Sequence, residues 1–379
     1  MLNRRSLRIK VMQSLFALQQ SKEATYELCQ EQIKDAFAPD LNSMEVQDKT
    51  LLNQQKKAAL QAFEEAFRQG HEKIAHEDSR VSAAVNAALA YYRDQVKKDT
   101  RFFLNNLVSE IERIYDHYIA TLSLATAFAD AAAADKKVSH KNFLSNAWIN
   151  ALRSSETLRK DALRLGRHWQ DHPDEIRHWF RDVVRQDNEY LAYLDRKNPS
   201  FDDQRKFVNH LFRKVILGKT VIGDFYEEEV LRWAEDREIV KALVEKTVKS
   251  YDPEADEEIA LHALSLNWEE DREFLETLYR RSTTLEPHHL ELIASNTRNW
   301  EVDRLPLTDR IILEMAIAEL LSFPNIPVKV TINEYIELAK TYSTPKSRTF
   351  VNGILDVMAK TLQETGEIKK SGRGLIDNK

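Results

Sequence analysis

The sequence has few of the residues that interrupt helices or cross-link chains. Its 379 residues include eight glycines, nine prolines and one cysteine. Alanine, leucine, glutamate, lysine and arginine, which favour helices, are abundant by contrast. The composition therefore predicts an almost entirely α-helical protein. The single cysteine, Cys29, excludes an intrachain disulfide and is typical of a protein from a reducing cytoplasm.

Long hydrophobic runs are also lacking. The first residues contain no apolar signal core, and the longest apolar-looking run, residues 120–134, is mostly alanine and is broken by Asp130. A membrane-spanning helix needs about 20 consecutive, predominantly apolar residues. The sequence thus predicts no membrane segment, and we expect a cytoplasmic protein.

Patterns typical of catalysis are missing as well. The eight glycines form no glycine-rich nucleotide loop. His168 and His172 lie four residues apart on a predicted helix and could share a metal ion, but no third ligand accompanies them, so we expect exposed or capping histidines. Lys346 and Ser347 are adjacent and would point in different directions on a helix, which argues against a serine–lysine pair. We expect a protein that is not an enzyme and has no metal or cofactor.

The charges are distributed unevenly along the chain. The net charge is −6, yet the first 22 residues contain five lysines or arginines and no acid. Residues 340–379 contain eight basic and four acidic residues, a local net charge of +4. Basic ends can simply be solvated tails that keep a protein soluble, or they can form a surface for an anionic partner.

One predicted helix start near the C-terminus favours the second interpretation. Thr344 followed by Pro345 is typical of an N-cap and a first helical residue. The apolar residues that follow at helical spacing are Phe350, Val351, Ile354, Leu355, Met358 and Leu362. The first turn of a helix favours acidic residues, but this turn carries Lys346 and Arg348 beside Ser347. Positive charge added to a positive helix end predicts a site for an anion.

The rest of the chain divides into five predicted parts. A first helix occupies residues 3–21, and its Phe16 lies on a second apolar stripe that suits a partner. Residues 22–100 are polar and predict extended helices with a poor core. The predicted domains are the first helix at 1–21, a helical insertion at 22–135, degenerate helical repeats at 136–255, a C-terminal helical bundle at 256–365 and a flexible basic tail at 366–379.

An internal repeat connects two of these parts. Residues 203–207 (DQRKF) correspond to residues 270–274 (EDREF) at an offset of 67 residues, and Trp233 falls on Trp300 at the same offset. A fainter third copy ends at Trp169. Each copy predicts two helices, with the tryptophan as a core anchor near the start of the second. Stacked copies would extend one continuous bundle.

Two further features concern the C-terminal bundle. Thr331 and Glu334 have the spacing of a capping box and predict a helix start at that point. Gly353 lies inside the last predicted helix, where glycine costs about 1 kcal/mol relative to alanine. Close packing of a neighbouring helix, or of a ligand, would explain the glycine.

The residues of this bundle resemble a known family. Residues 326–334 (IPVKVTINE), 337–340 (ELAK) and 350–356 (FVNGILD) closely resemble the signature of NusB, a bacterial transcription antitermination factor. At the other end of the chain, residues 4–8 (RRSLR) and 13–16 (QSLF) resemble the arginine-rich first helix of that family. The two matching ends occur in the right order.

The resemblance covers residues 3–21 and 268–363. It implies an all-α, NusB-like helical bundle in which helical repeats are inserted between the first helix and the C-terminal bundle. This arrangement is similar to the long form found in one bacterial group. Residues 22–100 look like an additional insertion, about which the resemblance says nothing.

The resemblance also implies a function and its partners. NusB proteins bind the boxA element of nascent ribosomal transcripts together with NusE, a small ribosomal-subunit protein, and so act indirectly on the RNA polymerase elongation complex. The implied RNA-binding residues are Arg4, Arg5, Arg8, Lys346, Ser347, Arg348 and Phe350. The implied NusE-binding residues are Phe16 and Asp309. Cations for phosphates and an aromatic ring for an unstacked base agree with this assignment.

Two positions depart from the family pattern. The family usually has glutamate where this chain has Ile9, and many members carry an acid at the position of Lys346. A lysine there should strengthen phosphate binding, so we expect RNA affinity to depend less on NusE than is usual. The alternative function is a non-catalytic helical scaffold in ribosomal RNA processing or ribosome assembly, with the acidic segments 224–245 and 252–276 as its working surface.

Overall fold

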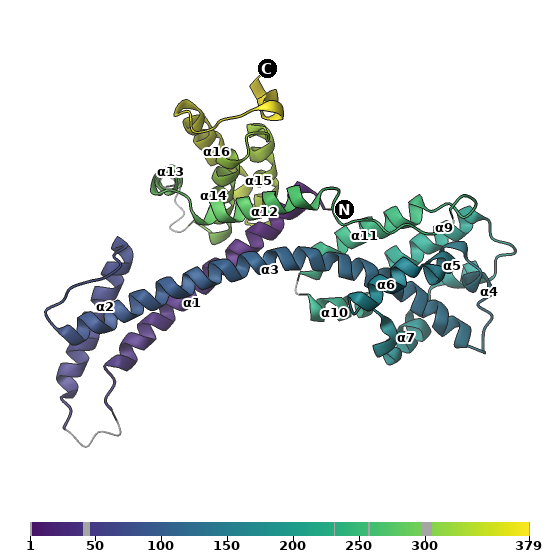
Figure 1. Ribbon diagram of the computed structural model, residues 1–379, viewed down its shortest axis with the longest axis horizontal. Coiled ribbons are helices and arrows are strands. Elements are labelled where there is room, and N and C mark those ends of the chain that lie inside the picture. The colour runs from purple at the N-terminus through teal and green to yellow at the C-terminus, as the bar shows by residue number, and fades with distance from the viewer. Residues whose placement is uncertain (1, 41–45, 231, 257, 298–304, 379) are drawn as a thin grey trace. The chain divides into compact units, whose positions relative to one another are not determined.

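The computed structural model describes residues 2–40, 46–230, 232–256, 258–297 and 305–378 (Figure 1). Every regular element in these ranges is a helix, which confirms the predicted all-α fold. None of the described helices combines the length and the apolar character needed to cross a membrane. The chain divides into two compact units, Met1–Arg4 with Ser109–Asp271 and Arg5–Val108 with Arg272–Lys379.

The unit that contains residues 109–271 is built around the second half of the long helix α3 (Ser79–Ala134). This helix ends just before Asp135. The α-helices that follow are α4 (Lys141–Leu144), α5 (Ala147–Ser154), α6 (Glu156–Arg164), α7 (Pro173–Trp179), α8 (Asn188–Leu194), α9 (Phe201–His210), α10 (Thr220–Glu229) and α11 (Trp233–Ser250). Short 3-10 and π-helical turns lie at Trp169–Asp171, Phe180–Val184 and Leu211–Ile216.

Aromatic residues dominate the core of this unit. Trp233 begins α11 and stacks on Tyr226, with ring centroids 4.3 Å apart. Trp169 is buried as well, so the prediction of tryptophan core anchors is confirmed for both residues. The third repeat tryptophan, Trp300, lies outside the described residues. His172 packs its ring edge-on against Phe225, which gives it a packing role.

The two clear copies of the repeat belong to different units. Helix α9 carries the first copy in the unit just described, whereas α12 (Trp268–Thr283) carries most of the second copy in the other unit. The buried cluster around α9 and α11 contains no residue of α12. The middle of the chain thus forms a core of its own, and the expected stacking of the copies into one continuous bundle stays a prediction.

The unit that contains both ends of the predicted NusB-like region starts with α1 (Arg4–Ala36), which continues far beyond the predicted end at residue 21. Its further helices are the first half of α3, α2 (Lys49–Gln69), α12, α13 (Pro287–Thr297), α14 (Leu307–Ser322), α15 (Val328–Tyr342) and α16 (Ser347–Glu364). Helix α1 runs antiparallel to α3. Ser14 Oγ donates to the carbonyl of Phe103 at 3.2 Å, and Ser21 Oγ donates to Asp99 Oδ2 at 2.6 Å.

The insertion after the first helix has a small core, although a poor one was expected. Phe63 of α2 and Val85 of α3 are fully buried together with Cys29 and Ile33 of α1. Figure 1 shows α2 folded against the paired ends of α1 and α3. Although the outer faces of these helices are polar, a narrow strip of apolar residues lies between them, and it is enough to hold the three helices together.

Helix starts in the C-terminal bundle differ from the predictions. Helix α15 begins at Val328, so Thr331 lies within its first turns and is buried, and no capping box forms. Helix α16 begins at Ser347, after a turn at residues 345–346, and its N-cap residue is Lys346 in place of Thr344. Gly353 is exposed, and a Cβ atom built on it would have no neighbour within 4 Å. Close helix packing at Gly353 is therefore wrong.

The C-terminal tail is ordered where flexibility was expected. Lys370 Nζ donates to the carbonyl oxygens of Leu320 and Phe323 at the end of α14, at 3.0 Å in both cases. The backbone N–H of Ser371 donates to the carbonyl of Pro324. A 3-10 turn at Gly372–Asn378 follows. The tail thus supplies a donor to the Leu320 carbonyl near the end of the helix, and a second donor to the Phe323 carbonyl, which also accepts from the N–H of Ile326.

Candidate nucleic-acid interface

The start of α16, residues 344–348, is anchored to the rest of the bundle by the buried hydroxyl group of Ser347. Ser347 Oγ donates to Asp309 Oδ2 in the first turn of α14 at 2.6 Å, and it lies 2.8 Å from Thr344 Oγ1. The backbone N–H of Ser347 donates to the carbonyl of Thr344 at 2.9 Å. These bonds fix the turn that carries Lys346. Ser347 is therefore the buried residue that anchors this turn.

The solvent-facing side of the same turn is positively charged. Lys346 and Arg348 are both exposed, and within the described ranges neither has an acidic oxygen at ion-pair distance. The first turn of α16 contains no acid, as the sequence predicted. The helix dipole adds further positive potential at this point. The start of α16 is consequently arranged to attract an anion.

The arginines at the start of α1 have acidic partners. Arg5 Nε and Nη2 donate to the two carboxylate oxygens of Glu334 on α15, both at 2.8 Å. These bonds hold the pKa of Glu334 below its usual range, although partial burial opposes the shift. Arg4, which belongs to the other unit, donates to Glu270 at 2.6 Å. Arg5 remains half-exposed despite its partner.

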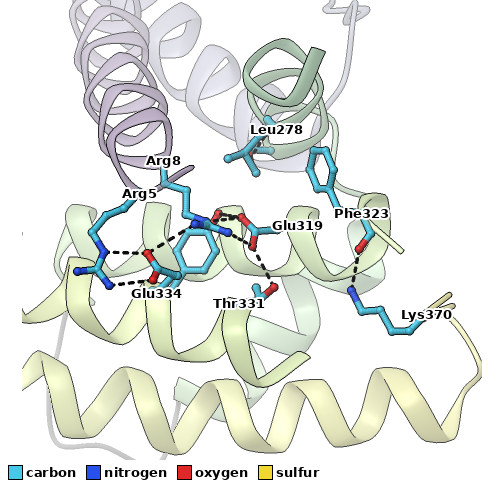
Figure 2. A network of polar contacts seen from close by, with 10 residues as sticks. Arg5, Arg8, Leu278, Glu319, Phe323, Thr331, Glu334 and Lys370 are labelled. Atoms are coloured by element: carbon cyan, nitrogen blue, oxygen red, sulfur yellow. Dashed lines mark hydrogen bonds and ion pairs between the residues drawn. The ribbon is translucent and has the colours of Figure 1, made fainter. Parts of the chain in front are cut away.

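Arg8 is buried in a polar cluster that we call the Glu319 clamp, formed by Arg8, Glu319, Thr331 and Tyr335. Figure 2 shows Arg8 and Thr331 on either side of Glu319. Its Nε and Nη2 atoms donate to the two carboxylate oxygens of Glu319, both at 2.7 Å. Thr331 Oγ1 and Tyr335 Oη donate to the same carboxylate at 2.9 and 3.0 Å. The clamp joins α1, α14 and α15.

The electrostatics of the Glu319 clamp are those of a permanent ion pair. Burial alone would lower the pKa of Arg8, but the hydrogen bonds and charge of Glu319 outweigh it and the pKa rises. Burial raises the pKa of Tyr335 well above its usual value, and the neighbouring Glu319 charge adds to the rise. Both raised pKa values keep Arg8 and Tyr335 protonated near neutral pH. The clamp is therefore a structural joint between helices.

The remaining predicted site residues divide by exposure. The ring of Phe350 is buried, so it offers no free face to a base in this arrangement. Phe16 is 41% exposed on α1, as a partner-facing aromatic residue should be. Asp309 is buried, and its Oδ1 atom has no hydrogen-bond partner among the described residues. The roles of these residues in RNA or NusE binding remain predictions.

Sequence reasoning missed the acidic partner of Arg8. Glu319 stands within the apolar run of α14 and lies 311 positions from Arg8. An acid on the buried face of an apolar helix needs a partner, and this was the available signal. Nothing in the sequence showed which of the several arginines would supply it.

These features define an all-helical protein that presents an exposed, cationic helix start above a buried hydroxyl–carboxylate contact. Residues 234–360 match the model of the NusB family. The NusB transcription antitermination protein of Salinibacter ruber is 44% identical over 127 residues, which cover 79% of that relative and 32% of this chain. The chain therefore belongs to the NusB family.

Two further relatives match shorter segments. The NusB transcription antitermination protein of Chloroherpeton thalassium is 49% identical over 85 residues, 40% of its length and 22% of this chain. The one of Natranaerobius thermophilus is 41% identical over 92 residues, 66% of its length and 24% of this chain. No solved structure gives a significant match. The family match includes the start of α16 but not α1.

Proposed function

We propose that this protein acts in transcription antitermination by binding boxA-like single-stranded RNA of nascent ribosomal transcripts together with NusE. Its relatives are named transcription antitermination proteins, which supports the general function. On this proposal the chain catalyses no reaction, and it acts on the RNA polymerase elongation complex through its partners.

The start of α16 is the observation that carries the proposal. Lys346 and Arg348 project from a helix whose first turn contains no acid, and the one carboxylate that contacts this turn, Asp309, is buried against Ser347. Phosphate groups of RNA fit such a site, because lysine and arginine bind them as cations and the helix end adds N–H donors. Gly353 leaves open space one and a half turns further along the helix. A flexible single strand has room to approach the backbone there.

The predicted RNA residues take two different parts in this proposal. Arg4, Arg5, Lys346 and Arg348 keep cationic groups accessible and contact phosphates. Arg8, Ser347 and Phe350 are buried and hold the helices that carry those groups. A base-stacking role for Phe350 needs the ring to become exposed on binding.

The proposed NusE contact involves Phe16 and the region of Asp309. Phe16 offers an exposed aromatic surface, which is typical of interface anchors. Asp309 contacts Ser347 directly, so a partner that shifts the first turn of α14 also shifts the start of α16. Through this hydrogen bond, NusE binding near Asp309 would change the position of the RNA-binding turn.

Electrophoretic mobility shifts with a boxA-like RNA test the proposal. We expect binding by the protein alone that weakens steeply with salt, and only a modest gain on adding NusE, because Lys346 supplies an extra phosphate contact. A scrambled RNA of equal length is the matched control. Equal affinity for both RNAs would contradict the proposed function, whereas strict dependence on NusE would contradict only the role given to Lys346.

A further inference from the structure

Two histidines and a glutamate converge at a place that the proposed RNA site does not use. His288 and His289 begin α13, and Glu367 follows the end of α16. Glu367 Oε2 lies 3.1 Å from His288 Nε2 and 2.8 Å from His289 Nε2. The three ligand atoms all lie within 4.8 Å of one another. Two imidazole nitrogens and one carboxylate oxygen thus face a common point.

The surroundings hold two of these three side chains in place. Thr365 Oγ1 donates to Glu367 Oε1 at 2.9 Å, which leaves Oε2 for the histidines. Glu286 Oε2 lies 3.5 Å from His288 Nδ1, the ring nitrogen that points away from the common point. Outer partners of this kind orient ligands in metal sites. Gly366, with φ of 75°, makes the turn that brings Glu367 back toward α13.

The exposure of the three residues suits a site that is anchored on one side and open on the other. The side chain of His289 is 7% exposed, that of Glu367 32% and that of His288 53%. The buried histidine fixes the position, and the exposed one leaves a path for an ion. A water molecule or another ligand would supply a fourth donor from the solvent side.

A simple ion pair explains this arrangement less well. Exposed ion pairs contribute only about 0–1 kcal/mol to the stability of a fold. Such a pair does not require two imidazole rings to share one carboxylate oxygen, as His288 and His289 do here. The donor set is instead the one that zinc prefers, with bonds of about 2.0–2.2 Å to nitrogen and oxygen. Such bonds place neighbouring donors about 3.3 Å apart in a tetrahedral site. The two distances from Glu367 Oε2 to the histidine nitrogens, 3.1 and 2.8 Å, would change by only a few tenths of an ångström.

We propose that His288, His289 and Glu367 bind one divalent transition-metal ion, with zinc as the best fit. The ion would tie the start of α13 to the segment after α16. That segment leads into the docked tail, so the ion would fasten the C-terminal end of the bundle. The proposal is independent of RNA and NusE binding.

Calorimetric titration of the untagged, chelator-treated full-length chain with ZnCl₂ tests the site. We expect one ion per chain. His288→Ala should weaken binding by more than about 100-fold, since losing only an outer partner of a ligand already costs up to that much. The matched control is His178→Ala, because His178 faces a single carboxylate, Asp182, at 2.9 Å. This control should bind zinc as the wild type does.

A second variant and a second readout guard against misfolding. Glu367→Gln keeps the shape of the side chain and should also lose the ion, while circular dichroism checks its helix content. Zinc should raise the melting temperature of the wild type and of His178→Ala, but not of the two ligand variants. Failure of the wild type to bind one equivalent, or unchanged affinity in His288→Ala, would overturn the proposal.

Discussion

The starts of α1 and α16 are equally rich in basic residues, yet the structure uses their charges in opposite ways. Arg5 and Arg8 of α1 donate paired hydrogen bonds to Glu334 and Glu319. Lys346 and Arg348 of α16 are exposed and have no acidic partner in the described part of the chain. Local charge density alone therefore does not identify a binding surface. What distinguishes the two helix starts is whether the fold supplies counter-charges.

The largest expected effect comes from breaking the buried pair at α1. Glu319→Gln removes the carboxylate that accepts both Arg8 hydrogen bonds and leaves the buried guanidinium with only the more distant Glu334 oxygen, 3.5 Å from Nη1. This should lower the free energy of unfolding by about 3–5 kcal/mol. Urea unfolding followed by circular dichroism measures the change. The matched control is Arg5→Gln, which breaks an exposed pair and should cost about 0–1 kcal/mol. Equal effects of the two changes would remove the contrast between a structural and a surface arginine.

Loss of the buried Ser347 hydroxyl at the start of α16 should have the next largest effect on stability. Ser347→Ala removes the hydroxyl that donates to Asp309, leaving that buried carboxylate without this partner and costing about 2 kcal/mol. Thermal unfolding gives the readout. Thr349→Val removes an exposed hydroxyl near the start of the same helix and should change little. If the two variants melt alike, Ser347 is not the support that we describe.

The exposed charge of α16 should matter for RNA and not for folding. Lys346→Glu should weaken binding of boxA-like RNA by roughly tenfold and flatten its salt dependence, because a phosphate contact is replaced by repulsion. Fluorescence anisotropy at two salt concentrations measures both quantities. Lys360→Glu makes the same charge change near the other end of α16 and serves as the control. Unchanged affinity in Lys346→Glu would refute the assigned site.

The smallest expected effect concerns the pH dependence of the Arg5–Glu334 pair. The hydrogen bonds from Arg5 lower the pKa of Glu334 from its ordinary 4.5. The carboxylate therefore stabilises the fold above about pH 4.5, and this contribution is lost as the pH falls through the lowered pKa. The melting temperature should drop on acidification below pH 4.5, and slightly less in Glu334→Gln. An identical drop in both proteins would show that the pair contributes nothing.

Much of the fold could be predicted from the sequence because helices are encoded locally. The scarcity of glycine and proline and the helical spacing of apolar residues are properties of short segments, and the all-α fold is confirmed. The residues at which helices start were harder to predict. Thr344–Pro345 and Thr331 look like caps in isolation, but contacts with α14 decide that α16 begins later and α15 earlier.

The candidate site was predictable only in part, for a similar reason. The acid-free turn at Lys346 is a local pattern, and the structure retains it. Whether an arginine is available depends on acids far away in the chain, as the separation of 311 positions between Arg8 and Glu319 illustrates. The convergence of His288, His289 and Glu367 has the same origin, since tertiary folding brings together residues 78 and 79 positions apart.

The docked tail has a consequence for the handling and turnover of the protein. Lys370 caps the carbonyls of Leu320 and Phe323, and Leu320 directly follows Glu319 in α14. A carboxypeptidase that trims the chain past Lys370 would uncap this helix end and let its last turn fray. Because Glu319 lies in that turn, the loss of a few C-terminal residues would loosen the joint that holds α1, at the opposite end of the polypeptide.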